Sequence, residues 1–279
     1  MKPALRAALA AGPFPRASSH TILWQWDPTS DANLTLSGAS VQQCNDMSGN
    51  SRNATASGTA GPDRVTGGSG INNVNVLQFI GANNDALTFQ NALSMLNGAD
   101  CVGIDGIVQP TSLSGGGLLH QVIASVSGNR FGTSFLSTGV LHVSTKRVQA
   151  DTQVNVDSVT AILSTSYASY FHIQVDLAEP RARFIVDDAI DSVSFSPWAS
   201  GAGPFENLNS ATAPTFGRVG STKLNALVGP LRLWRGFMTV ADAVAQRLTW
   251  QATFATPLQT WDISEPTLYA GAEKVYQYA

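Results

Sequence analysis

Short apolar or alternating runs recur along the chain from about residue 21, and turn-forming residues separate them. In the run at 171–177 every odd position is apolar, whereas His172, Gln174 and Asp176 occupy the even positions. Because side chains alternate across a strand, this pattern predicts a strand with one buried face and one solvent-exposed face. Ten runs are predicted to be strands: 21–26, 75–81, 101–109, 118–126, 139–145, 159–166, 171–177, 182–188, 214–220 and 227–234. Repeated short strands of this kind predict an antiparallel β-sandwich or barrel.

The pattern changes at only one place, 239–250, where it predicts a helix. The apolar stripe of this helix would contain Val240, Val244 and Leu248. Thr239 is a favourable N-cap residue, and Asp242 three positions later completes an approximate capping box. Because no helices alternate with the strands, the pattern excludes a doubly wound α/β fold and predicts one short C-terminal helix.

The chain is predicted to fold as one domain, 21–253, between two terminal extensions. The first extension, 1–20, contains an alanine-rich stretch that "GPFP" ends. It is too short to fold alone, so we expect it to be a docking arm. The second extension, 254–279, contains two prolines and is predicted to be an extended tail. Its aromatic residues favour packing on a neighbouring subunit, and therefore a homo-oligomer: Trp261, Tyr269, Tyr276 and Tyr278.

Composition supports the all-β prediction and narrows the range of partners. Hydrophobic residues make up 43% of the chain and charged residues 13%, about half of the usual charged fraction of roughly 25%. Hydroxyl and amide side chains replace Lys and Glu, which suits strands and turns better than helices. A net charge of −3 gives no basis for nucleic-acid binding, and no apolar run of about 18 residues could span a membrane. Cys44 and Cys101 are either two buried thiols or one disulfide.

Three segments occur in a fixed order: "NDMSGNSRNAT" at 45–55, "NVLQFIGANNDALTF" at 75–89 and "VGPLRLWRGFMTVADAVAQRL" at 228–248. Together they resemble the concanavalin A-like (laminin G-like) jelly-roll domain. The matching positions are Asp46, Ser48, Gly49, Asn50, Gly81, Asp85, Leu87, Leu231, Leu233, Trp234, Met238 and Thr239. Asp242 stands where the family usually has Glu, and Asp187-Asp188 stands where its hairpin usually has Asn-Gly. The resemblance implies an antiparallel jelly-roll β-sandwich over roughly 21–253.

The segment around the first motif, 22–65, has a narrower resemblance. It is similar to the opening of jelly-roll domains on tailed-phage virions and phage-like gene transfer agents, although Cys44 stands where an aromatic residue is common there. This resemblance implies a head spike, fibre or tail appendage at the virion surface, assembled in the cytoplasm of the producing cell. The arm at 1–20 would then dock onto other virion proteins.

The polar stretch at 41–65 has two interpretations. In the first, Asp46 and Ser48 accept backbone N–H groups and Gly49 takes a positive φ, so that the stretch turns the chain. In the second, oxygen ligands around Asp46 or Asp85 hold Ca²⁺, as jelly-roll domains of this type often do. The two candidate clusters, Asn45-Asp46 and Asn83-Asn84-Asp85, each contain one carboxylate, so a Ca²⁺ site at either would be weak. No other cofactor is indicated.

Two loops combine aromatic rings with amide or charged groups, a mixture that binds sugars in shallow sites. The loop at 125–134 contributes Asn129, Arg130 and Phe131. The loop at 195–209 contributes Trp198, Phe205, Glu206 and Asn207. In each loop the rings either contact sugar or cover the core, and their exposure decides between the two.

These features predict a non-enzymatic virion appendage that binds cell-surface polysaccharide for host attachment. A structural virion domain that contacts only protein is the alternative. A glycan-degrading enzyme is disfavoured, because hydrolysis needs paired carboxylates and the "E-x-D-x-x-E" motif of jelly-roll glucanases does not occur in the sequence. We therefore assign no catalytic residues.

Overall fold

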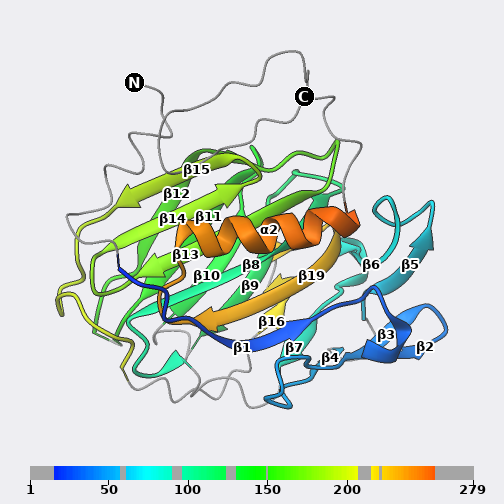
Figure 1. The fold of residues 1–279 in the computed structure, drawn as a ribbon, viewed down its shortest axis with the longest axis horizontal. Helices are drawn as coiled ribbons and strands as arrows, with labels where there is room; N and C mark the ends of the chain where they lie inside the picture. Colours follow the sequence, from blue (N-terminus) through cyan, green and yellow to red (C-terminus); the bar gives the residue numbers. More distant parts are fainter. Residues whose placement is uncertain are drawn as a thin grey trace.

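Two antiparallel β-sheets pack face to face, and one helix lies on the outer face of the first sheet (Figure 1). This computed structural model describes residues 16–56, 61–89, 96–123, 130–148, 150–206, 215–219 and 222–254. The fold is the all-β jelly-roll sandwich with one short C-terminal helix that the sequence predicts.

Strands far apart in the sequence form the first sheet. At its centre β8 (Cys101–Pro110) pairs with β13 (Ser169–Asp176) on one side and with β19 (Ala226–Arg235) on the other. Beyond β13 the sheet continues with β14 (Arg181–Val186) and β15 (Ala189–Ser194). Beyond β19 it continues with β1 (Thr21–Trp26), β6 (Asn73–Phe79) and, outside β6, β5 (Asp63–Gly67).

The second sheet supplies the opposite layer. Its strand order is β12 (Val154–Ile162), β11 (Val140–Lys146), β10 (Arg130–Phe135), β9 (Gly117–Ile123), β16 (Thr215–Phe216), β7 (Leu87–Phe89), β4 (Ala54–Ala56), β3 (Ser40–Cys44) and β2 (Leu34–Ser37). Four short elements lie in the connections: η1 (Asp31–Asn33), η2 (Gly81–Asn83), β17 (Arg218–Val219) and β18 (Thr222–Lys223).

The main core fills the space between the two sheets. Ile104 and Phe171 enter it from the first sheet and Phe131 from the second, and each is at most 1% exposed. Trp24 of β1 stacks on Phe89 of β7 with ring centroids 4.2 Å apart. Burying each large apolar side chain contributes roughly 1.5–3 kcal/mol, so these contacts hold the two layers together.

Both cysteines are buried free thiols. Cys44 is 1% exposed and Cys101 is 0% exposed. Burial raises the pKa of each thiol above its ordinary value, because the apolar surroundings disfavour the thiolate. The interpretation as two buried thiols is confirmed, and the disulfide alternative is wrong.

The second face of β13 is also buried, so the prediction of a solvent-exposed face at 171–177 is wrong. The polar residues of that face are each at most 3% exposed: His172, Gln174 and Asp176. The helix α2 (Val240–Phe254), the segment that leads into it and residues 16–20 cover them. The backbone N–H of Met238, for example, donates to Oε1 of Gln174 at 3.0 Å.

A buried ion pair lies beneath α2. Arg232 on β19 donates to both carboxylate oxygens of Asp105 on β8, at 2.7 and 2.8 Å, and the Tyr170 hydroxyl donates to the same carboxylate at 2.9 Å. Arg232 also donates to Gln246 of α2 at 2.8 Å and lies 5.3 Å from the ring centroid of Trp250. Burial raises the pKa of Asp105, and the charge and hydrogen bonds of its partners oppose that rise. The network therefore ties the helix to three strands.

The helix begins with the capping box that the sequence predicts. The N–H of Thr239 donates to Oδ2 of Asp242 at 3.0 Å, and the N–H of Asp242 donates to Oγ1 of Thr239 at 3.1 Å. The predicted apolar stripe is wrong, because Leu248 is 51% exposed. The buried side chains of the helix are instead Ala243, Trp250 and Phe254. Large rings bury more apolar surface than valine or leucine, so the ring-bearing face docks on the sheet. Within the described residues, no helix has the length and apolar character needed to cross a bilayer.

One carboxylate joins the edge strands of the two sheets. Asp191 on β15 accepts the backbone N–H groups of three consecutive residues of β12, 159–161, at 2.7, 2.7 and 2.8 Å. The Thr160 hydroxyl donates to the other carboxylate oxygen at 2.6 Å. Burial favours a higher pKa for Asp191, but these hydrogen bonds outweigh it and the pKa is lowered. Asp191 thus links the first sheet to the second sheet at this edge.

The described part of the N-terminal extension, 16–20, lies against the first sheet. Arg16 donates to the carboxylate of Asp176 at 3.1 Å. This contact gives a nearly buried carboxylate a positively charged partner. The remainder of the extension, 1–15, and the tail at 255–279 lie outside the described residues. The docking arm and the tail-mediated oligomer therefore stay predictions.

Removing one partner of the buried pair should destabilise the fold strongly. Arg232→Met leaves Asp105 without its counter-ion in the interior, and we expect the free energy of unfolding to fall by about 3–5 kcal/mol. The double variant Asp105→Asn/Arg232→Met removes both charges, keeps an acceptor for Tyr170 and should recover most of that loss. Urea unfolding measures both effects, with Arg235→Met at the exposed end of β19 as the matched control. A single variant as stable as the wild type would contradict a structural role for the pair.

Candidate functional site

The loop at 195–209, described as far as Glu206, presents no exposed aromatic platform. Trp198 is 3% exposed and Phe205 is 1% exposed. The indole N–H of Trp198 donates to the backbone carbonyl of Thr145 at 3.4 Å. Both rings belong to the main core, so the expectation of exposed sugar-contacting rings in this loop is wrong, and the rings cover the core instead.

A buried arginine fixes the conformation of the same loop. Arg147 is 5% exposed and donates to the backbone carbonyls of Pro204 and Ser200, each at 3.1 Å. It also donates to Oε1 of Glu206 at 2.6 Å, although the side chain of Glu206 is 54% exposed. Of the predicted residues here, Glu206 alone reaches solvent among those described, because Asn207 lies outside the described residues.

The second predicted loop, 125–134, is described from Arg130 onward, where β10 begins. Phe131 is 1% exposed and belongs to the main core, so it is not an exposed sugar-contacting ring. Asn129 lies outside the described residues. Sugar contacts by Asn129 and Arg130 therefore stay a prediction. Phe131, the ring next to them, is buried and would not take part.

Within the polar stretch at 41–65, the segment around Asp46 turns the chain as predicted. One carboxylate oxygen of Asp46 accepts two backbone N–H groups at 3.1 and 2.9 Å. The other accepts the N–H of Arg52 and the hydroxyl of Ser48, both at 2.9 Å. Gly49 has a φ of 83°, as the turn requires. Because donor hydrogens surround the carboxylate, its geometry favours the turn over a Ca²⁺ ligand.

The other candidate ligand for Ca²⁺, Asp85, is 4% exposed and accepts the N–H of Ile80 at 2.7 Å. Burial raises the pKa of Asp85. Among the described residues, no group of three His, Cys, Asp or Glu side chains is placed to hold a metal ion. The surroundings of the two carboxylates therefore give the proposed Ca²⁺ site no support.

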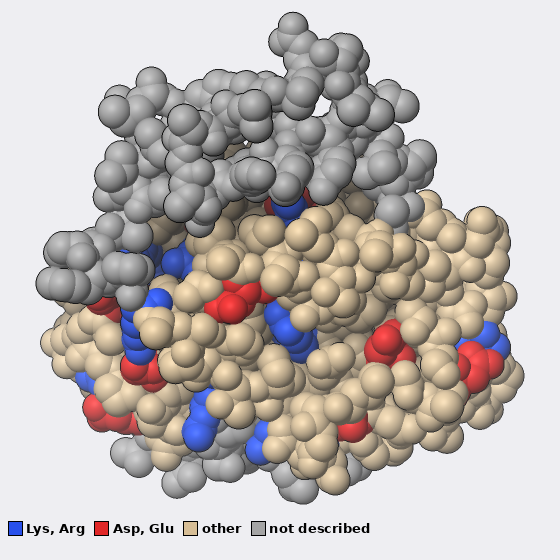
Figure 2. All heavy atoms as spheres, viewed as in Figure 1, with Lys and Arg blue, Asp and Glu red and all other residues tan. Residues whose placement is uncertain are grey.

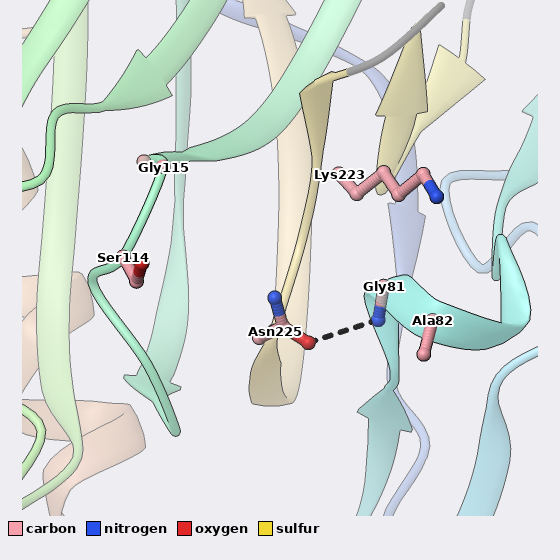
Figure 3. A pocket seen from close by; sticks show the side chains of 7 residues that line it. Gly81, Ala82, Ser114, Gly115, Lys223 and Asn225 are labelled. Carbon is pink, nitrogen blue, oxygen red and sulfur yellow. Dashed lines mark hydrogen bonds between the residues drawn. The ribbon is translucent and has the colours of Figure 1, made fainter.

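An open polar pocket lies at one end of the sandwich, where three connections meet (Figure 3). Its volume is about 280 Å³, close to the lower end of the roughly 300–1,000 Å³ usual for ligand sites. Its lining residues are Gly81, Ala82, Ser114, Gly115, Gly116, Lys223 and Asn225. In Figure 3, Ser114 and Gly115 lie on one side, Gly81, Ala82 and Lys223 lie on the other, and Asn225 lies between them.

Asn225 holds both sides of this pocket in place. Its backbone carbonyl accepts the N–H of Thr111 at 2.9 Å, and its Oδ1 accepts the N–H of Gly81 at 2.9 Å. A Cβ atom at position 81 would lie 3.1 Å from the side chains of Asn225 and Lys223, so a larger residue there would have to displace these side chains by a few tenths of an ångström. The amide nitrogen of Asn225 points away from Gly81 and donates to no other described residue (Figure 3).

Among the described residues, Lys223 is the only charged one that lines the pocket. In the β17–β18 hairpin it lies directly opposite Arg218, so two positive charges project from neighbouring positions of one small hairpin. The face of the molecule in Figure 2 carries only scattered charges on a largely uncharged surface. The pocket therefore combines one cation with neutral hydrogen-bonding groups.

The sequence pattern does not indicate this pocket. Gly81 is one of the positions that match the jelly-roll family, and no pattern singles out Ser114, Lys223 or Asn225. The available signals were the glycine run at 115–117 and a lysine in a chain with few lysines. Neither signal relates the three connections to one another, and only the folded sheets bring them together.

No protein-family model and no curated protein sequence matches the chain. Its fold is similar to that of domain 4 of AbnA, a GH43 extracellular arabinanase from Geobacillus stearothermophilus, solved in complex with arabinotriose. The two chains are 12% identical with a TM-score of 0.57, and the similarity covers 83% of this chain and 100% of the other. At this level of identity the similarity shows a shared fold.

Two botulinum neurotoxin structures share the fold as well. The binding domain of neurotoxin DC, solved in complex with SialylT, is 9% identical with a TM-score of 0.51. The serotype D/C VPI 5993 binding domain is 9% identical with a TM-score of 0.50. Each similarity covers 84% of this chain but only 52% and 53% of the toxin chains, respectively. The class that these proteins and this chain share is the antiparallel β-sandwich.

Trp198→Ala should destabilise the domain because it opens a cavity in the core. We expect a loss of about 3–5 kcal/mol in the free energy of unfolding, measured by urea unfolding. Trp198→Phe keeps most of the apolar volume and serves as the matched control, with a smaller loss. If Trp198→Ala unfolded at the same urea concentration as the wild type, the ring would not be part of the core.

Asp46→Ala should destabilise the turn independently of calcium. It removes the acceptor of three backbone N–H groups, and leaving such donors unpaired costs about 1–3 kcal/mol each when they are buried. Because these groups are partly exposed, we expect a total loss of about 2–3 kcal/mol. Thermal unfolding in EDTA and in millimolar Ca²⁺ tests this, with Asp31→Ala, a surface carboxylate, as control. A midpoint that rises with Ca²⁺ in the wild type alone would restore the metal interpretation.

Proposed function

We propose that this domain binds carbohydrate and does not cleave it. The observation that carries the proposal is its similarity to domain 4 of AbnA over that domain's whole length, because that structure holds arabinotriose. The neurotoxin binding domain in complex with SialylT adds a second β-sandwich of the same fold. Fold similarity supports a binding role by analogy, so the chemistry of this chain's own surface must fit as well.

The surface chemistry of the chain fits sugar recognition. With only 13% charged residues, its polar groups are mainly hydroxyls, amides and exposed backbone. These groups both donate and accept hydrogen bonds, as sugar hydroxyls do. The pocket beside η2 has this character, since it combines the Ser114 hydroxyl and the Asn225 amide with backbone of glycine residues.

The lining of the pocket also suits binding without cleavage. Most glycoside hydrolases need two carboxyl groups roughly 5–9.5 Å apart around the scissile bond. In the part of the chain that the structure describes, no Asp or Glu lines this pocket. The carboxylate of Asp85, which follows η2, is 4% exposed and accepts the N–H of Ile80, so it is engaged in the structure of the corner.

We further propose that the domain attaches a phage-like particle to a cell-surface polysaccharide. The resemblance of 22–65 to the opening of virion jelly-roll domains supports this role. A small open pocket holds a sugar weakly, and many copies on one particle would raise the overall avidity without any new contact. In this arrangement the part of the N-terminal arm at 1–15 docks on other virion proteins, and the tail at 255–279 packs on a neighbouring subunit.

A domain that contacts only protein is the second candidate function, and one observation favours it. On β12, an edge strand of the second sheet, Val159 is 69% exposed and Ile162 is 43% exposed. Exposed apolar residues on an edge strand are a common feature of protein contacts. This surface lies apart in sequence from every residue that lines the pocket.

Binding to a panel of purified capsular and cell-surface polysaccharides distinguishes the candidates. We expect saturable, weak binding by isothermal titration calorimetry, and no release of reducing sugar from the bound polymer. The variant Val159→Ser/Ile162→Ser leaves the pocket intact and serves as the control, since it should retain polysaccharide binding. A folded domain that binds no member of the panel would contradict the proposal, and reducing-sugar release would indicate an enzyme.

A further inference from the structure

We propose that the pocket formed by η2, the 111–116 connection and the β18–β19 connection selects a sugar unit that carries one negative charge, such as a uronic acid, through Lys223. The inference rests on the proposed function, because it names the class of sugar that the site takes. Three features of the pocket carry it: an available cation, a set of available donors and the pocket's size.

Lys223 supplies the positive charge. It lines the pocket, and among the described residues it forms no ion pair with Asp or Glu. The nearest acidic residue along the η2 corner, Asp85, is enclosed and accepts the N–H of Ile80. The ammonium group is therefore available to an anion that enters from solvent, and a charge-assisted hydrogen bond is stronger than a neutral one.

The neutral groups of the pocket are available mainly as donors. Both acceptors of Asn225, its backbone carbonyl and its Oδ1, already bind Thr111 and Gly81. Its amide nitrogen donates to no other described residue, and the Ser114 hydroxyl can donate as well. In Figure 3 the Lys223 ammonium points away from Asn225, so it would contact a different part of the same sugar unit, and these donors match a ligand rich in acceptors. A carboxylate offers two acceptor oxygens and a negative charge, whereas a neutral hydroxymethyl group offers one oxygen and no charge.

The size and openness of the pocket fit one charged unit of a longer chain. A volume of about 280 Å³ is below the usual range for sites that enclose a drug-sized ligand. One sugar unit can therefore enter, while the units on either side continue across the surface. Selectivity would then depend on the group that points at Lys223 rather than on the length of the polymer.

The positive charge of Lys223 makes anion binding sensitive to salt. Binding should therefore weaken as salt concentration rises, because mobile ions screen exposed charges.

Substitutions at two positions test the inference without removing the structural contacts of the site. Lys223→Gln removes the charge, and Lys223→Arg restores it. Asn225→Asp keeps the acceptor for Gly81 but replaces the amide donors with a negative charge. The matched control is Arg235→Gln, which removes a positive charge at the opposite, exposed end of β19. Thermal unfolding of each variant verifies that the domain remains folded.

The ligands are the acidic members of the polysaccharide panel, each paired with its carboxyl-reduced form, together with sulfated and neutral polymers. We expect the domain to prefer an acidic polymer over its carboxyl-reduced form. Lys223→Gln should weaken that binding about tenfold, as the loss of one charge-assisted hydrogen bond does. Lys223→Arg should retain it, and Asn225→Asp should abolish it. A preference for sulfated over carboxylated polymers would keep the anionic site and change the identity of its charged group.

Two outcomes would overturn the inference and leave the proposed function standing. One is equal affinity for an acidic polymer and its carboxyl-reduced form. The other is retention of full affinity by Lys223→Gln and Asn225→Asp while both remain folded. No binding to any polymer of the panel would instead refute the proposed function itself, so the two failures can be told apart.

Discussion

The bidentate pairing of Arg232 with Asp105 is the interaction on which the second face of the first sheet depends. A sheet face that carries polar side chains would ordinarily be left in water, yet here a helix covers it. The pairing allows this because Asp105 of β8 and Arg232 of β19 neutralise each other inside the protein. Arg232 also donates a hydrogen bond to Gln246 of the helix. Buried ion pairs contribute little net stability and can instead specify one arrangement. The contacts of Arg232 with Gln246 and Trp250, together with the apolar packing of the helix, hold α2 over this face.

Much of the fold was predictable because it is encoded in local chemistry. The turn around Asp46 and the capping box of α2 use short side chains that hydrogen-bond nearby backbone, and the hairpin at Asp187-Asp188 turns with Asp187 at a φ of 50°. Two errors have one cause. The alternation of apolar and polar residues indicates that the two faces of β13 differ in polarity. It does not indicate which other elements cover those faces. The stripe through Leu248 failed in the same way, since the large ring of Trp250 decided which helix face docks.

The candidate site was less predictable than the fold. An aromatic residue in a glycine- and proline-rich loop has the same sequence signature whether it contacts sugar or covers the core. Trp198 and Phe205 proved to be core residues because Arg147 and the edge of the main core hold their loop inward. The pocket, by contrast, is built from glycines, one serine, one asparagine and one lysine, none of which forms a motif. Its chemistry arises when the ends of β6, β8 and β18 meet, and such a meeting depends on the register of the whole sheet.

The enclosure of both cysteines has a practical consequence for anyone who works with this domain. Thiol reagents attack the thiolate, and neither sulfur atom is reachable or easily ionised in the folded chain. A cysteine introduced at the surface would therefore be the single group that a maleimide dye modifies, with no need to replace the native pair. Fluorophores or spin labels could be attached beside Lys223 in this way, and the native cysteines would react only in molecules that have opened.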